Sequence, residues 1–186
     1  AGAEILLGVA GVDGAVSVTI RAAHAADIFR LQEIERAAGE LFRDSDLIDI
    51  DAMSVVAIGD HVHAMEQGLS LLAEADGRAA GFIMGQMHFG DAYLHELDVD
   101  PAFGRRGIGA ALVMRFIEAA KAKGARAVYL STFRTPQWNA PFYRKLGFVD
   151  VARADYLPWM SAIENQQAKF LDVNTRVFMR LGCRAP

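Results

Sequence analysis

The chain has very little cysteine and no long apolar segment. Cys183 is its single cysteine among 186 residues, which excludes an intramolecular disulfide framework and is typical of a reducing compartment. No apolar run is long enough to span a bilayer, and the glycine-rich start lacks the basic residues of a secretory signal. We therefore expect a cytoplasmic protein that acts on no membrane, with Cys183 outside any catalytic motif.

The chain also lacks an overall excess of positive charge. Its net charge is −4 at pH 7, and this argues against nucleic acid as a partner. The charges are unevenly placed, however, because residues 105–153 are mainly basic and suit a polyanionic cofactor. Acids dominate residues 33–60, which hold Glu33, Glu35, Glu40, Asp44, Asp46, Asp49, Asp51 and Asp60 against Arg36 and Arg43.

Apolar patterns predict an α+β chain without internal repeats or interdomain linkers. Residues 1–15 are expected to form a loose N-terminal extension and residues 16–186 a single domain. Strands are predicted at residues 16–21, 69–75, 79–89, 92–99, 127–133, from 148, and at 176–181. Helices are predicted at residues 25–38, 52–67, 108–123, 140–146 and 161–170.

The loop at residues 104–110, between a predicted strand and a predicted helix, carries the clearest functional signal. It reads Gly-Arg-Arg-Gly-Ile-Gly-Ala. Gly107 and Gly109 let backbone N–H groups approach a phosphate, and the helix N-terminus adds positive partial charge. The loop lacks the Lys-Ser/Thr pair of nucleoside-triphosphatases, and Leu112 replaces the third glycine of dinucleotide-binding loops. A diphosphate cradle is therefore predicted, with a tight turn that binds nothing as the alternative.

A second motif lies at residues 137–148, which read Gln-Trp-Asn-Ala-Pro-Phe-Tyr-Arg-Lys-Leu-Gly-Phe. Asn139 and Tyr143 are four residues apart, so they share one face of a helix. In the simpler interpretation, Asn139 only caps the helix and Tyr143 only packs.

The two motifs, in this order and with a predicted strand between them, resemble motifs A and B of the GNAT N-acetyltransferase superfamily. Motif A, Gln/Arg-x-x-Gly-x-Gly/Ala, begins here at Gly104, where the family usually carries Gln or Arg. The resemblance implies the three-layer GNAT acyltransferase fold, a mixed, mostly antiparallel central sheet flanked by helices and splayed in the middle. It also implies acetyl-CoA as cofactor, bound by Leu97, Asp98, Val99, Gly104, Arg105, Arg106, Gly107, Ile108, Gly109, Ala110, Asn139 and Tyr143.

The implied reaction is direct transfer of an acetyl group to a primary amine. Keeping a lysine-like amine neutral at pH 7 costs roughly 4.6 kcal/mol, so a general base is useful. Glu96 stands where many family members place this base, although a solvated strand carboxylate is the alternative. The resemblance makes Tyr143 the acid that protonates the departing thiolate. Strict strand alternation predicts that His95 points away from Glu96 and packs.

A non-catalytic acyl-CoA-binding or protein-interaction module on the same fold is the rival interpretation. Glu96, Asn139 and Tyr143 together favour an enzyme, because a binding module needs no proton-transfer pair. The acceptor is expected to be a small-molecule or peptide amine. The acids of residues 33–60 could attract a cationic acceptor or simply form a solvated face, and the resemblance leaves a homodimer open.

Two remaining features carry less information. His61 and His63 have a spacing seen in metal sites, but no third ligand is evident, so no metal is expected. Trp138 and Trp159 either line the acceptor pocket or pack in the core.

Overall fold

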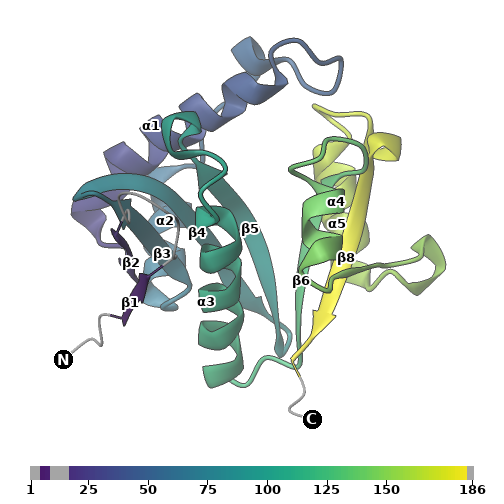
Figure 1. The fold of residues 1–186 in the computed structure, drawn as a ribbon. Helices are drawn as coiled ribbons and strands as arrows, with labels where there is room; N and C mark the ends of the chain where they lie inside the picture. The colour runs from purple at the N-terminus through teal and green to yellow at the C-terminus, as the bar shows by residue number, and fades with distance from the viewer. Residues whose placement is uncertain (1–4, 9–16, 184–186) are drawn as a thin grey trace.

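One eight-stranded sheet, in the order β1-β2-β3-β4-β5-β6-β8-β7, runs through the computed structural model, which describes residues 5–8 and 17–183 (Figure 1). Neighbouring strands are antiparallel except for β5 and β6, which are parallel. The strands are β1 (Ile5–Gly8), β2 (Ser17–Ala22), β3 (Ser70–Ala75), β4 (Arg78–His88), β5 (Asp91–Val99), β6 (Ala127–Phe133), β7 (Val149–Asp150) and β8 (Arg176–Gly182).

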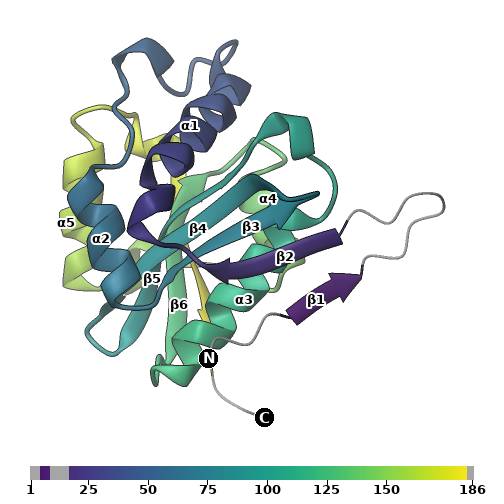
Figure 2. The same ribbon diagram turned by 90° about the vertical axis from the view of Figure 1, so that its left-hand side faces the viewer.

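Helices cover both faces of the sheet and give three layers (Figure 2). One face carries α1 (Ile28–Gly39), α2 (Ile58–Glu66) and α5 (Pro158–Gln167), and the other carries α3 (Ile108–Ala122) and α4 (Ala140–Lys145). Alternation along β4 explains the division, because Phe82 and Met84 pack under α1 and α2 whereas Ile83 joins the α3 core. None of the helices in the described part of the chain is long and apolar enough to cross a membrane.

The sheet is splayed between β5 and β6. These strands pair only at Ala92 opposite Val128 and at Tyr93 opposite Tyr129. Beyond this point they diverge towards the α1 end of the molecule (Figure 1). The backbone of β5 from Leu94 to Val99 therefore keeps its pairing to β4, and no strand of the described residues lies along its other edge. This confirms the splayed, mostly antiparallel sheet that the family resemblance implied.

Most predicted elements are present, with some differences at their ends. Within the predicted extension, Ile5–Gly8 form β1 and pair with β2, while Val16 lies outside the described residues. The prediction of a helix from residue 52 was wrong, because α2 begins only at Ile58. The preceding segment is extended, and both polar backbone groups of Val56 bond to side chains of α1. This is a tertiary effect that the local pattern does not reveal.

Candidate active site

A β-bulge in β5 decides which side chains reach the splay. Gly85 of β4 pairs with Leu94 and Met84 pairs with Glu96, so His95 has no partner of its own. The extra residue shifts the alternation by one position. Leu97 therefore packs on the same α3-side core as Leu94, and Glu96 turns to the other face.

The prediction that His95 points away from Glu96 was wrong for this reason. The His95 ring lies 6.2 Å from that of Tyr93, and the charge of Asp60 on α2 acts on it. Glu96 interacts with Glu35 on α1. Both side chains thus face the layer that contains α1 and α2.

Three carboxyl groups, from Glu35, Glu96 and Asp98, come together on this face. Burial, with the charge of Glu96, raises the pKa of Glu35 to about 8. Burial also raises the pKa of Glu96 to about 7, although Arg176 opposes the shift. The pKa of Asp98 is raised by burial and by the other two carboxylates, and its Oδ2 is buried without a hydrogen-bond partner. A carboxyl group with a pKa near neutrality is suited to accept a proton from an amine.

Arg176, at the start of β8, faces Glu96 across the splay, since its charge acts on that carboxyl group. Its Nη2 donates to the carbonyl oxygen of Ser131 at 2.8 Å, and its guanidinium lies 4.6 Å from the ring centroid of Phe133. Sequence reasoning missed both Arg176 and the role of Glu35. Nothing in the local sequence marks either residue, because only the fold brings α1, β5 and β8 together.

Aromatic side chains connect the α1–α2 segment to the far side of the splay. Phe42 lies 5.4 Å from Phe133 of β6 and 5.8 Å from Trp138, measured between ring centroids. Trp138 is 48% exposed, so it is not a core residue. Trp159 instead packs against Tyr93 in the core under α5.

Tyr143 enters the splay from α4, on the opposite side of the sheet from Glu35. Its ring is buried among core side chains and lies 5.7 Å from that of Phe148. Burial raises the pKa of Tyr143, and the charges of Glu96 and Asp98 add to this effect. The phenol therefore stays protonated at neutral pH and can act as a proton donor.

Asn139 does not use its side chain to cap α4. Its Nδ2 instead donates to Thr132 Oγ1 of β6 at 2.8 Å, while its Oδ1 is buried without a hydrogen-bond partner. Asn139 is thus the N-cap residue of α4, as the simpler interpretation expected, but its side chain does not cap the helix. A buried acceptor without a donor is costly, and here it lies beside the open edge of β6.

The predicted phosphate cradle forms the loop before α3. Gly107 has a left-handed φ of 78° as the N-cap residue of α3, and a Cβ built there meets no atom within 4 Å. The first intrahelical bond runs from the N–H of Ala111 to the carbonyl of Gly107. Among the described residues, nothing accepts from the preceding N–H groups of Ile108, Gly109 and Ala110, which are thus free donors at the helix N-terminus.

The other predicted cofactor contacts flank this loop. Arg105 also has a positive φ of 62°, and Arg106 lies over the ring of Phe103 at 5.5 Å. The predicted backbone contacts at Leu97, Asp98 and Val99 lie on the free edge of β5 described above. The cradle, this edge and Asn139 thus border one opening.

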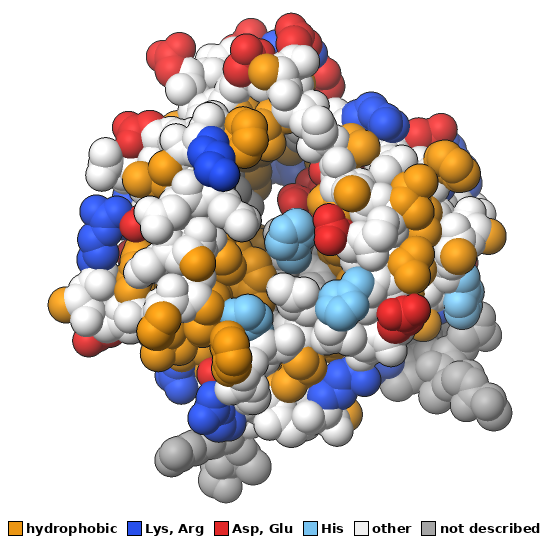
Figure 3. Space-filling view, turned by 180° about the vertical axis from the view of Figure 1, so that it is seen from behind, with side chains coloured by type: hydrophobic (Ala, Val, Ile, Leu, Met, Phe, Trp, Pro, Cys, Tyr) orange, Lys and Arg blue, Asp and Glu red, His pale blue; other side chains and the backbone are white. Residues whose placement is uncertain are grey.

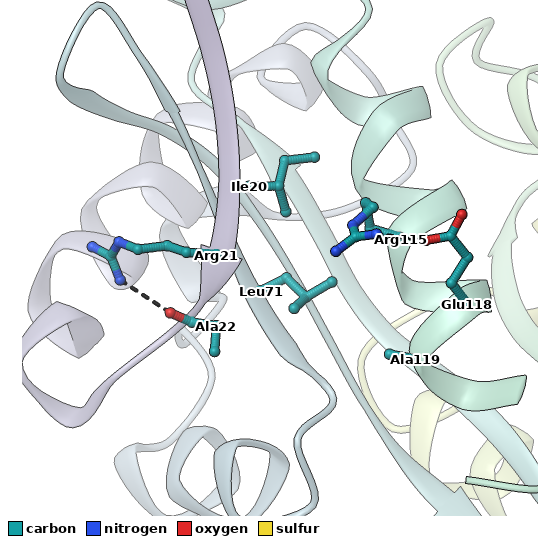
Figure 4. Close-up of a pocket in the computed structure, with 7 residues that line it drawn as sticks. All are labelled: Ile20, Arg21, Ala22, Leu71, Arg115, Glu118 and Ala119. Atoms are coloured by element: carbon teal, nitrogen blue, oxygen red, sulfur yellow. Dashed lines mark hydrogen bonds and ion pairs between the residues drawn. The ribbon is translucent and has the colours of Figure 1, made fainter. Parts of the chain in front are cut away.

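Figure 3 shows a hollow in the middle of the face opposite to the view of Figure 1, with acidic and histidine side chains beside it. A separate depression of about 160 Å³ lies between β2, β3 and α3 (Figure 4). An ion pair of 2.7 Å between Arg115 and Glu118 borders it, and it contains none of the predicted site residues. Among residues 5–8 and 17–183, no cluster of His, Cys, Asp and Glu is able to hold a metal ion.

Curated proteins of similar sequence include N-acetyltransferases. The chain is 32% identical over 94 residues to the ribosomal protein bS18-alanine N-acetyltransferase of Salmonella typhimurium, which covers 50% of this chain and 64% of the relative. It is 36% identical over 84 residues to an uncharacterised N-acetyltransferase of Methanocaldococcus jannaschii, and this match covers 41% of this chain and 37% of the relative. The matches thus span less than two thirds of either relative.

Solved structures share the fold over most of the chain. The PaiA N-acetyltransferase from Thermoplasma acidophilum, in complex with coenzyme A, has a TM-score of 0.69 at 20% identity and covers 89% of this chain and 99% of its own. The ribosomal-protein-S18-alanine N-acetyltransferase from Escherichia coli has a TM-score of 0.63 at 21% identity, with 91% and 96% covered. At these identities the likeness is one of fold.

The model of the acetyltransferase (GNAT) family matches residues 29–148. This range is more than half of the chain, and it contains β5 with Glu96, the loop before α3, Asn139 and Tyr143. The chain therefore belongs to the acetyltransferase (GNAT) family.

Proposed function

We propose that this protein is an acetyl-CoA-dependent N-acetyltransferase that moves the acetyl group directly to a primary amine. One observation carries the proposal. The splay between β5 and β6 brings a carboxyl group with a pKa of about 7, Glu96, and a protonated phenol, Tyr143, to the same opening. The opening is bordered by the free N–H groups at the start of α3.

The residues around the opening fit acetyl-CoA. Phosphate oxygens fit at the free helix N–H groups, where the Cβ position of Gly107 is open space. The unpaired Oδ1 of Asn139 is an acceptor for an amide donor. The free edge of Leu97, Asp98 and Val99 offers backbone groups to an extended chain. When bound, acetyl-CoA supplies the acetyl group as a thioester. The solved structures of similar fold with coenzyme A or acetyl-CoA support this choice of cofactor.

Glu96 is the proposed general base. Because its pKa is raised to about 7, it is partly ionised at neutral pH and can accept a proton from an ammonium group. Asp98 and Glu35 beside it also have raised pKa values, so their carboxyl groups ionise when a cationic acceptor lies next to them. Tyr143, on the other side of the splay, is the proposed proton donor to the leaving group.

The non-catalytic alternative explains these features less well. Burying the carboxyl groups of Glu35, Glu96 and Asp98 together costs folding free energy, as their raised pKa values show. A module that only binds acyl-CoA needs the loop before α3 and the edge of β5 but gains nothing from this cluster.

The acceptor class remains a small-molecule or peptide amine in this proposal. The names of the relatives include an enzyme for the alanine of a ribosomal protein and a mycothiol acetyltransferase, so related sequences serve both kinds of acceptor. A cytoplasmic location is part of the proposal, because the single cysteine suits a reducing compartment.

The test is a panel of amines with acetyl-CoA, followed by free-thiol release and by the mass of the acetylated product. We expect thiol release that requires an amine and that falls strongly in Glu96→Gln. The matched control is Glu74→Gln, an acid on β3 that pairs with Arg21 outside the site. Binding of CoA by calorimetry without acetylation of any amine would favour the non-catalytic module.

A further inference from the structure

Arg176 is a rigidly held cation without an acidic partner. Two of its nitrogens are engaged with Ser131, Nη2 with the carbonyl oxygen at 2.8 Å and Nε with Oγ at 3.3 Å. The ring of Phe133 supports the guanidinium plane at 4.6 Å. Within the described residues, no carboxylate forms an ion pair with Arg176 and no hydrogen bond uses its Nη1. One side of the guanidinium is therefore free.

This free cation faces the reaction centre. The groups on which its charge acts are Glu96 and Tyr93 of β5 and Tyr143 of α4. Burial lowers the pKa of Arg176 itself, so the side chain is partly removed from water. An unpaired cation in such surroundings is costly unless an anion arrives with a ligand.

The phosphates of the proposed cofactor do not suit this role. Arg176 and Phe178 are two residues apart in β8, so their side chains lie on the same face of the sheet. The Phe178 ring packs on that of Trp159 in α5, with 6.1 Å between the ring centroids. The glycine loop and α3 lie on the opposite face of the sheet. Arg176 therefore faces the side that also carries Glu35 and Glu96, away from the helix N-terminus that is proposed to bind phosphate.

We propose that Arg176 binds a carboxylate of the acceptor, so that the acceptor is an amine with a nearby carboxylate, as in a free amino acid. The proposal rests on the proposed acetyltransferase function. A guanidinium presents two parallel N–H donors that match the two oxygens of a carboxylate. The ammonium group of the same molecule is then directed to Glu96 and Asp98 across the splay. Opposite charges on the two walls thus orient a zwitterion.

The effect of Arg176 on Glu96 must be distinguished from its proposed binding of the acceptor carboxylate. Arg176 lowers the pKa of Glu96, so its loss would alter catalysis with every acceptor. Arg176→Lys keeps the positive charge but lacks the planar pair of donors. In Arg176→Lys, a change in KM that is confined to acceptors with a carboxylate would therefore indicate carboxylate binding. An effect through Glu96 alone would change the KM values of all acceptors alike.

The experiment compares matched acceptors with the full-length chain and acetyl-CoA. Each standard amino acid is paired with the amine that has hydrogen in place of the carboxylate, such as lysine with pentane-1,5-diamine, and an alanine-initiated peptide amide is added. We expect at least one amino acid to have a KM about tenfold or more below that of its paired amine. Arg176→Lys should raise the KM for the amino acid about tenfold and change that for the amine less than about twofold.

Arg180 provides the matched control. It lies on the same strand and the same face, is exposed, and donates to Tyr129 Oη at 3.1 Å away from the reaction centre. Arg180→Lys should leave both KM values unchanged, and thermal unfolding with CoA titration verifies that each variant is folded.

Equal KM values within every pair, acetylation of the peptide amide alone, or an equal effect of Arg176→Lys on both acceptors would overturn the inference. So would intact CoA binding without acetylation of any amino acid. Absence of CoA binding in the parent protein would instead refute the proposed function.

Discussion

The loop before α3 allows the cofactor assignment to be tested with a single methyl group. Gly107 has a φ of 78°, and a Cβ at this position meets no protein atom within 4 Å. In Gly107→Ala, the methyl group therefore removes no packing, and the cost to the free protein is the left-handed backbone alone. That cost is about 1–2 kcal/mol. For a chain of this size it corresponds to a decrease in Tm of roughly 2–8 °C.

The same methyl group would occupy open space at the N-cap of α3. If phosphate oxygens occupy this space to reach the helix N–H groups, as the cofactor assignment requires, the methyl group collides with them. We expect CoA affinity to fall at least about tenfold, or about 1.4 kcal/mol, as measured by isothermal titration calorimetry.

Gly124→Ala, at the other end of α3, is the matched control. Gly124 also has a left-handed φ, of 81°, and a Cβ there likewise meets nothing within 4 Å. Alanine should therefore cost about the same 1–2 kcal/mol of stability and leave CoA affinity within about threefold. Equal CoA affinity in Gly107→Ala and the parent, with the expected decrease in Tm, would refute the assignment of the cradle.

Three further predictions concern titratable groups. Glu96→Gln should reduce kcat/KM most near neutral pH and least at high pH, where the amine is already deprotonated, and a loss independent of pH would contradict base catalysis. Tyr143→Phe should lower kcat while the Kd for CoA stays within about twofold, and a change confined to KM would make Tyr143 a binding residue. Because the pKa of Glu35 is raised to about 8 from about 4.5, its ionisation removes stability as pH rises between these values. The Glu35→Gln variant should therefore have a higher free energy of unfolding than the parent at pH 9 but not at pH 4. A difference between the two proteins that is the same at both pH values would refute the raised pKa of Glu35.

Local sequence predicts those parts of the fold and site that depend on neighbours along the chain. The helix at Ile108–Ala122 and the hairpin of β3 and β4 follow from periodicity and from the Asp76-Gly77 turn. The glycine loop and Tyr143 follow from short motifs. Glu35 and Arg176 have no such motif, because each gains its role from contacts with strands distant in sequence.

The bulge at His95, a single extra residue, changes which side chain of β5 reaches the site. Strict alternation would place Glu96 with Leu94, in the apolar core under α3, where a carboxylate has no partner. The sequence contains a signal against this, since Gly85 lies in the interior of a strand, directly after the apolar residues 82–84. A Cβ at this position would collide with the carbonyl oxygen of Tyr93 and would lie 2.6 Å from Phe116 Cζ. Glycine at 85 thus allows β5 and α3 to approach β4 closely at the bulge, and the bulge in turn places Glu96 on the face of the sheet that carries α1 and α2. The position of the proposed base therefore depends on a glycine in the neighbouring strand as much as on Glu96 itself.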